Sequence, residues 1–170
     1  MTNKKKMKMK KLSLSVLFIF LALSMYGQLA STSPENKKIM LEEFTGIYCT
    51  FCPDGHAIAQ AIQDNYPGEV FLINIHEGGY ANPNGSDPDF RTPFGTAISS
   101  QSGLVGYPAG TVNRTNFPGL EQGAAGTTAM SRGSWGNATN VTLNEPSYVN
   151  VGVEATIDMS SGELIVHVQA

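Results

Sequence analysis

The pattern of apolar and polar positions predicts one α/β unit early in the chain. An apolar run over 39–44 is typical of a strand and ends at Thr45-Gly46. Over 50–65 apolar residues recur at helical spacing, and 69–75 is a nearly continuous apolar run. Such a run predicts a central strand that is buried on both faces. A strand, a helix and a second strand in this order predict a βαβ unit with parallel strands.

The middle of the chain is rich in Gly, Asn, Asp and Pro, which predicts loops separated by short elements. The expected elements, in chain order, are a loop over 76–88, a helix over 89–100, a strand over 109–114, a loop over 115–126 and a helix over 127–140. Met130 and Trp135 are expected to be core residues of that last helix.

The end of the chain changes to a period of two. Apolar residues alternate with polar ones over 148–157, the turn Ser160-Ser161-Gly162 follows, and a second apolar segment covers 164–168. This pattern predicts a β-hairpin. The sequence ends inside the second strand, which would leave an open edge for pairing. We therefore expect that the hairpin over 146–170 begins a longer, truncated β-rich domain.

Charge separates the two ends of the sequence. The net charge is −3, yet six of the eleven basic residues lie among the first eleven positions. From Gln28 onward there are five basic and fourteen acidic residues, a formal charge of −9. The acidic part has no basic patch, so nucleic acid is not an expected partner.

The N-terminus has the three regions of a secretory signal peptide. Lysines open the chain, an apolar run covers 12–23, and small and polar residues follow. Cleavage is expected near Ala22-Leu23-Ser24 or after Gly27, so 1–27 is the predicted signal peptide and 28–37 a loose leader. An uncleaved N-terminal anchor is the alternative. No cysteine lies near the cleavage zone, which excludes a lipoprotein anchor. The folded part is expected to be exported, where disulfides persist.

The two cysteines of the chain, Cys49 and Cys52, stand three residues apart at the start of the first predicted helix. The N–H groups and positive dipole end of a helix N-terminus stabilise a thiolate, here on Cys49. Cys52 lies one turn further on and can resolve a mixed disulfide. We expect Cys49 to be the more exposed sulfur and the nucleophile, with Cys52 partly buried behind it. Pro53 suits a first helical turn.

Two ionisable side chains, Glu43 and His56, are expected near the cysteine pair. Glu43 lies near the end of the first strand, where a buried carboxylate could accept a proton from Cys52 during exchange. The alternative is that Glu42 and Glu43 are both solvated. His56 lies on the same helix and either tunes the thiols or caps a surface, and we favour the surface role.

Three functional classes remain open from these residues. A redox module would exchange disulfides with protein substrates, whereas a non-enzymatic surface protein would keep Cys49–Cys52 as a fixed bridge. Zinc binding by the cysteines with His56 or His76 is the third class, but structural zinc sites require four ligands at tight spacing. The loop over 82–89 has oxygen ligands suited to calcium, although turn chemistry explains its composition equally well. No metal or cofactor site is predicted.

A resemblance to a known sequence motif favours some of these functional classes over others. Glu43-Phe44 followed by Tyr48, Cys49 and Cys52 resembles the thioredoxin superfamily motif of an acid and a Phe on a strand, an aromatic residue and CxxC. Tyr48 stands where tryptophan is usual. More narrowly, residues 42–56 read Glu-Glu-Phe-Thr-Gly-x-x-Cys-x-x-Cys-Pro-Asp-Gly-His, and 106–114 read Gly-Tyr-Pro-x-Gly-x-Val-Asn-Arg. Both runs resemble the twenty-eight-kilodalton outer-membrane-protein-related family of the Bacteroidetes.

The resemblance implies a thioredoxin-like domain over 38–145, with a central mixed sheet flanked by helices, and a β-sandwich-like segment after it. It also implies a cis peptide bond before Pro108, which would shape the groove that receives a substrate backbone. Tyr48 and Tyr107 are then expected substrate contacts, beside the catalytic set of Cys49, Cys52, Glu43 and Pro108. The family implies an exported protein of the periplasm, outer membrane or cell surface, regarded as a surface protein or candidate adhesin.

Overall fold

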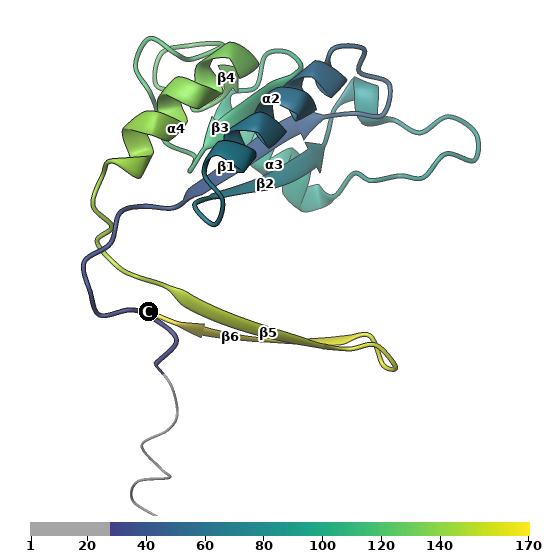
Figure 1. Cartoon of the computed structure of the whole chain (residues 1–170). Helices are drawn as coiled ribbons and strands as arrows, with labels where there is room; N and C mark the ends of the chain where they lie inside the picture. Colours follow the sequence, from purple (N-terminus) through teal and green to yellow (C-terminus); the bar gives the residue numbers. More distant parts are fainter. Residues whose placement is uncertain (1–27) are drawn as a thin grey trace, which may run out of the picture. The chain divides into compact units, whose positions relative to one another are not determined.

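The computed structural model describes residues 28–170 (Figure 1). The predicted signal peptide over 1–27 lies outside these residues. The described residues form two compact units, one over 36–146 and one that combines 28–35 with 147–170. The domain boundaries expected from the sequence stay a prediction.

A four-stranded mixed sheet forms the centre of the larger unit. Its strands are β1 (Ile39–Thr45), β2 (Val70–His76), β3 (Ala109–Val112) and β4 (Met130–Ser131), in the order β2-β1-β3-β4. Strands β1 and β2 are parallel, as predicted, and α2 (Cys52–Asn65) connects them. The pairs β1–β3 and β3–β4 are antiparallel. The crossover helix therefore begins at the end of β1, where the cysteines lie.

Helices cover both faces of this sheet (Figure 1). Helices α2 and α4 (Trp135–Leu143) pack on one face, and α3 (Pro93–Ser102) packs on the other. The first face holds the larger core, made of Ile39, Leu41, Ala59, Ile62, Val70, Val112, Met130, Trp135 and Ala138. The second face has a smaller core, made of Phe44, Ile75, Ala109 and Ala129. This sheet with its helices is a thioredoxin-like fold, as the sequence predicted.

Strand β1 lies between β2 and β3, and all but one of its seven residues are buried. Because side chains alternate along a strand, Leu41 and Glu43 point to the face covered by α2 and α4, whereas Glu42 and Phe44 point to the α3 face. Consecutive glutamates in a buried strand thus enter two different layers.

The prediction of a β2 buried on both faces is wrong. Strand β2 is the edge of the sheet, and Phe71 and Ile73 are 46% and 44% exposed. An apolar run reports only that a strand has few polar side chains. Its burial depends on neighbours distant in sequence, which the run does not contain.

The predicted helix over 127–140 is wrong in its first half. Residues Met130–Ser131 pair with β3, a short 3-10 helix η2 (Arg132–Ser134) follows, and α4 begins only at Trp135. Pairing with the open edge of β3 overrides local helical propensity. Met130 and Trp135 are both buried, as predicted, and Trp135 Nε1 donates a hydrogen bond to the Met130 carbonyl at 3.2 Å.

Two other boundaries differ from the predicted ones. Helix α3 begins at Pro93 rather than at 89, because the Thr92 side chain accepts the Gly95 N–H and caps the helix at that point. The third strand ends at Val112, since Asn113 and Arg114 adopt the left-handed backbone region with φ values of 50° and 49°.

The second unit contains the predicted hairpin, β5 (Gly152–Asp158) paired with β6 (Glu163–Gln169). Only Gly152 among the strand residues is buried. The leader predicted over 28–37 stays a prediction, and some of its backbone groups are hydrogen bonded within this unit. The Gln169 Oε1 accepts from Leu29 N at 2.6 Å, and Asn150 Nδ2 donates to the Ser31 carbonyl at 2.9 Å.

Across residues 28–170, no helix combines the length and the apolar character needed to span a membrane.

Candidate active site: a dithiol pair above a buried glutamate

The cysteines lie in the tight connection between β1 and α2. Cys49 N donates to the Gly46 carbonyl at 3.0 Å, which closes a turn directly after the strand. Tyr48 N donates to the Tyr80 carbonyl at 3.0 Å and ties the turn to the short 3-10 helix η1 (Gly79–Ala81). A Cβ on Gly46 would lie 2.3 Å from the Tyr80 carbonyl carbon, so the connection requires glycine there.

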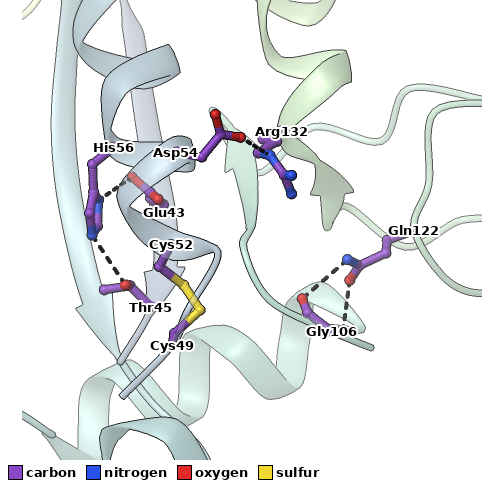
Figure 2. Close-up of a disulfide and its surroundings, with 9 residues drawn as sticks. All are labelled: Glu43, Thr45, Cys49, Cys52, Asp54, His56, Gly106, Gln122 and Arg132. Carbon is purple, nitrogen blue, oxygen red and sulfur yellow. Dashed lines mark hydrogen bonds and ion pairs between the residues drawn. A yellow bond between two sulfur atoms is a disulfide. The ribbon is translucent and has the colours of Figure 1, made fainter. Parts of the chain in front are cut away.

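Cys49 and Cys52 form a disulfide, with their Cα atoms 5.4 Å apart (Figure 2). Cys49 is 7% exposed and Cys52 is 1% exposed, so the order of exposure is the predicted one, although both residues are buried. Helix α2 begins at Cys52, with Pro53 in its first turn and no side-chain cap from Phe51. The first N–H groups of the helix are therefore not engaged by a capping side chain.

Glu43 lies beneath the first turns of α2 (Figure 2) and is 2% exposed. Its Oε2 is 2.9 Å from His56 Nδ1, whereas its Oε1 has no hydrogen-bond partner among the described residues. A Cβ on Gly55 would lie 2.6 Å from this Oε1, so the glycine leaves room for the carboxylate. Burial raises the pKa of Glu43, and the hydrogen bond and charge of His56 oppose that rise. The structure excludes the alternative in which Glu42 and Glu43 are solvated.

The sequence favoured a surface role for His56, but in the structure its imidazole ring contacts the buried Glu43 carboxylate. Its Nδ1 meets Glu43, its Nε2 lies 3.4 Å from Thr45 Oγ1, and its side chain is 39% exposed (Figure 2). The position of His56 in the sequence could have predicted its contact with Glu43. His56 lies one helical turn after Cys52, and the adjacent Gly55 allows the helix to approach the strand closely.

Pro108 follows a cis peptide bond, as the resemblance implied, and is buried beside α2. A Cβ on Gly55 would lie 3.0 Å from Pro108 Cβ, so this proline and Glu43 both approach the same glycine. Tyr107 donates to Glu77 Oε2 at 2.5 Å, and its ring meets that of Tyr80 edge-on with centroids 5.6 Å apart. Burial, together with the Glu77 hydrogen bond, raises the pKa of Tyr107.

Tyr48 is 41% exposed and its hydroxyl donates to Asp87. This hydrogen bond is the main reason that the pKa of Tyr48 is raised. Tyr48 thus connects the dithiol turn to the long loop after β2. The contacts described here leave the substrate-binding roles of Tyr48 and Tyr107 as predictions.

Glu42 carries a second buried carboxylate, which the sequence analysis did not connect with Arg114. Arg114 Nε lies 2.8 Å from Glu42 Oε2 and Arg114 Nη2 lies 2.5 Å from Glu42 Oε1, a two-point ion pair. Thr111 Oγ1 donates to Oε2 at 3.1 Å. The partners are 72 residues apart in sequence, and no local pattern indicates such a pair.

Metal-binding arrangements are absent among residues 28–170, where no three His, Cys, Asp or Glu side chains cluster suitably. His56 is engaged by Glu43 and Thr45. In the loop considered for calcium, Asp87 accepts from Tyr48, and Arg91 binds Asp89 and holds the pKa of that carboxyl at about 2. These acidic groups thus have protein partners.

No family model matches the chain, and no curated protein matches it. Among solved structures, HBP35 of Porphyromonas gingivalis is similar, with 20% sequence identity and a TM-score of 0.46. The similar region covers 72% of this chain and 37% of that chain, so this chain spans well under half the length of HBP35.

Proposed function

We propose that this protein exchanges disulfides with protein substrates through Cys49 and Cys52. One observation carries the proposal: a buried carboxylate, Glu43, lies under the dithiol helix with one oxygen lacking a partner among the described residues. A buried polar atom without a partner costs about 1–3 kcal/mol and requires an explanation, and proton transfer in an active site is one such explanation. A proton from Cys52 would give this oxygen its missing hydrogen-bond donor.

The exchange proceeds in two balanced steps. The Cys49 thiolate attacks a substrate disulfide, so a mixed disulfide forms and the other substrate sulfur leaves as a thiolate. Cys52 then gives its proton to Glu43 Oε1, directly or through water, and its thiolate attacks the Cys49 sulfur. The Cys49–Cys52 bond forms and the second substrate sulfur leaves, so the substrate gains the two electrons that the dithiol loses. The same steps in reverse oxidise a substrate dithiol.

The surroundings support these roles. Helix α2 begins at Cys52, and the positive dipole end of the helix favours negative charge on the sulfur near it. Cys49 is the more exposed of the two cysteines, which suits the first attack, and Cys52 is the more deeply buried. Tyr48, Tyr107 and Pro108 are the proposed substrate contacts. The basic and apolar N-terminus supports export to the cell envelope, and the two sequence runs support kinship with the Bacteroidetes outer-membrane-protein-related family.

Cysteine substitutions test this proposal. Cys49→Ser should abolish reduction of insulin disulfides, because no nucleophile remains. Cys52→Ser should accumulate a mixed disulfide on Cys49 that mass spectrometry of acid-quenched samples detects. His167→Gln, an exposed substitution in β6, is the matched control and should behave as the unchanged chain. Insulin reduction no faster than the buffer thiol alone, by the unchanged chain, would refute the proposal.

A second function has one observation in its favour. Both cysteines are buried in the bridged state, which also suits a fixed bridge in a non-enzymatic surface protein. Such a bridge should resist reduction by glutathione, whereas an exchange site should equilibrate with it.

A further inference from the structure

The two oxygens of Glu43 have different surroundings. Oε2 meets His56 Nδ1 at 2.9 Å, while Oε1 lies against Gly55 without a hydrogen-bond partner in the described part of the chain. The carboxylate itself is 2% exposed. A proton that reaches Oε1 from inside the site therefore needs a route from this buried group to solvent.

His56 offers that route. One ring nitrogen contacts the buried carboxylate and the other contacts Thr45 Oγ1 at 3.4 Å, so the ring is held at two points. Its side chain is nevertheless 39% exposed, so the imidazole connects the buried layer with water. An imidazole also exchanges protons readily near neutral pH.

We propose that His56 is a positioning residue which keeps Glu43 ionised before exchange and passes its proton to solvent afterwards. This inference rests on the proposed exchange activity and adds a residue to it. Before Cys52 reacts, the imidazolium faces the carboxylate. When Glu43 takes the Cys52 proton, the imidazolium loses its charged partner and releases a proton to water. Exchange with water leaves the remaining imidazole proton on Nε2, so that Nδ1 is free to accept. The carboxyl group turns its proton towards Nδ1, which takes it; this restores the pair, and one proton has moved from Cys52 to solvent.

The electrostatics of the site agree with this role. Burial raises the pKa of Glu43, and the hydrogen bond and positive charge of His56 are the influences that lower it. Two other ionisable groups meet this region: His76 on the neighbouring β2 and Arg132 on η2. Burial lowers the pKa of His76, and the charge of His56 lowers it further. Arg132 pairs with Asp54 and is thereby engaged elsewhere on α2 (Figure 2).

The test separates the two chemical steps in a single turnover. Reduced full-length protein is mixed with excess peptide disulfide, quenched in acid at set times and analysed by mass spectrometry. His56→Gln, which can hydrogen bond but carries no charge, should slow the conversion of mixed disulfide to Cys49–Cys52 roughly tenfold at pH 6. The difference should narrow between pH 6 and pH 9, because rising pH itself favours the ionised carboxylate. The first attack, by Cys49, should keep its rate.

Two further variants make the result specific. His56→Lys keeps a positive charge and should restore much of the resolution rate at pH 6. His167→Gln is the matched histidine control and should match the unchanged chain. Parallel pH profiles for the unchanged chain and His56→Gln would overturn this inference while leaving the exchange function intact. Absence of exchange by the unchanged chain would overturn both, so the two failures are distinguishable.

Discussion

Glu42 and Glu43 are adjacent in β1, nearly equally buried, and held in opposite ways. Glu42, on the α3 face, has both oxygens bound by Arg114 and a further hydrogen bond from Thr111. Glu43, on the α2 face, has one oxygen bound by His56 and one without a partner among the described residues. The first carboxylate has a complete set of partners and the second does not.

This difference in partners distinguishes a carboxylate that stabilises the fold, Glu42, from one that can accept a proton during exchange, Glu43. A buried ion pair with complete hydrogen bonding offers no vacant acceptor, and its loss leaves an uncompensated charge. A buried carboxylate with a vacant oxygen beneath a dithiol offers a site for one proton. Glu42 is thus assigned to stability and Glu43 to proton transfer, so loss of the Glu42 partners should destabilise the fold, whereas Glu43→Gln should slow exchange without destabilising it at neutral pH.

The largest expected effect is on catalysis. Glu43→Gln removes the proton acceptor and should slow the second exchange step roughly 100-fold, the lower end of the range for general-base catalysis. The rate of the first attack should change little. Acid-quenched single turnovers measure both steps. Equal resolution rates in the variant and the unchanged chain would remove Glu43 from the mechanism.

The next effect is on folding. Arg114→Ala leaves Glu42 without its ion-pair partner and should lower the free energy of unfolding by about 2 kcal/mol. The figure lies below the cost for a fully buried pair, because the Arg114 side chain is half exposed. Denaturant unfolding measures the loss. Arg91→Ala, which breaks an exposed pair with Asp89, is the control and should show no measurable change.

A smaller effect separates two buried threonines. Thr111→Val removes the hydroxyl that donates to Glu42 and should cost about 1.5 kcal/mol of unfolding free energy. Thr139 is equally buried, but its hydroxyl has no partner among the described residues. Thr139→Val should therefore be neutral or slightly stabilising. Equal losses in the two variants would mean that the hydrogen bond to Glu42 is not what stabilises this face.

The smallest effect is a pH dependence of stability. Burial raises the pKa of Glu43 in the folded chain, so folding favours its protonated form. That contribution is complete below the ordinary glutamate pKa of about 4.3 and is lost as pH rises through the higher folded-state value. Glu43→Gln stays neutral and should become more stable than the unchanged chain as pH rises, by about 1 kcal/mol at pH 8. Thermal unfolding from pH 4 to pH 8 should show the gap widening, and a constant gap would contradict it.

Local sequence information predicted the dithiol end of the fold well. The strand before the cysteines, the crossover helix and the parallel pairing of β1 with β2 all follow from short-range periodicity. The buried Trp135 also followed from its residue type. The two-residue strand Met130–Ser131 did not, because its structure depends on the open edge of β3 rather than on its own propensity.

Only part of the candidate site could be predicted from the sequence, because some of its contacts join residues that are distant in the sequence. The cysteines and Glu43 belong to one contiguous motif, so their proximity is encoded locally. The Glu42–Arg114 pair joins residues 72 positions apart through a left-handed turn at Asn113-Arg114, which nothing local indicates.

The hairpin shows what an alternating pattern can and cannot predict. The pattern predicted both strands, yet every residue of β6 is exposed. Alternation predicts a strand and does not by itself predict burial.

The reduction potential of Cys49–Cys52 tests the central claim most directly. The full-length protein would be equilibrated in buffers of defined glutathione and dithiothreitol potential, and the reduced fraction counted by thiol alkylation and mass spectrometry. An exchange site should titrate between about −270 and −120 mV, the range of dithiols that turn over. A midpoint below about −300 mV would identify a fixed structural bridge and contradict the account.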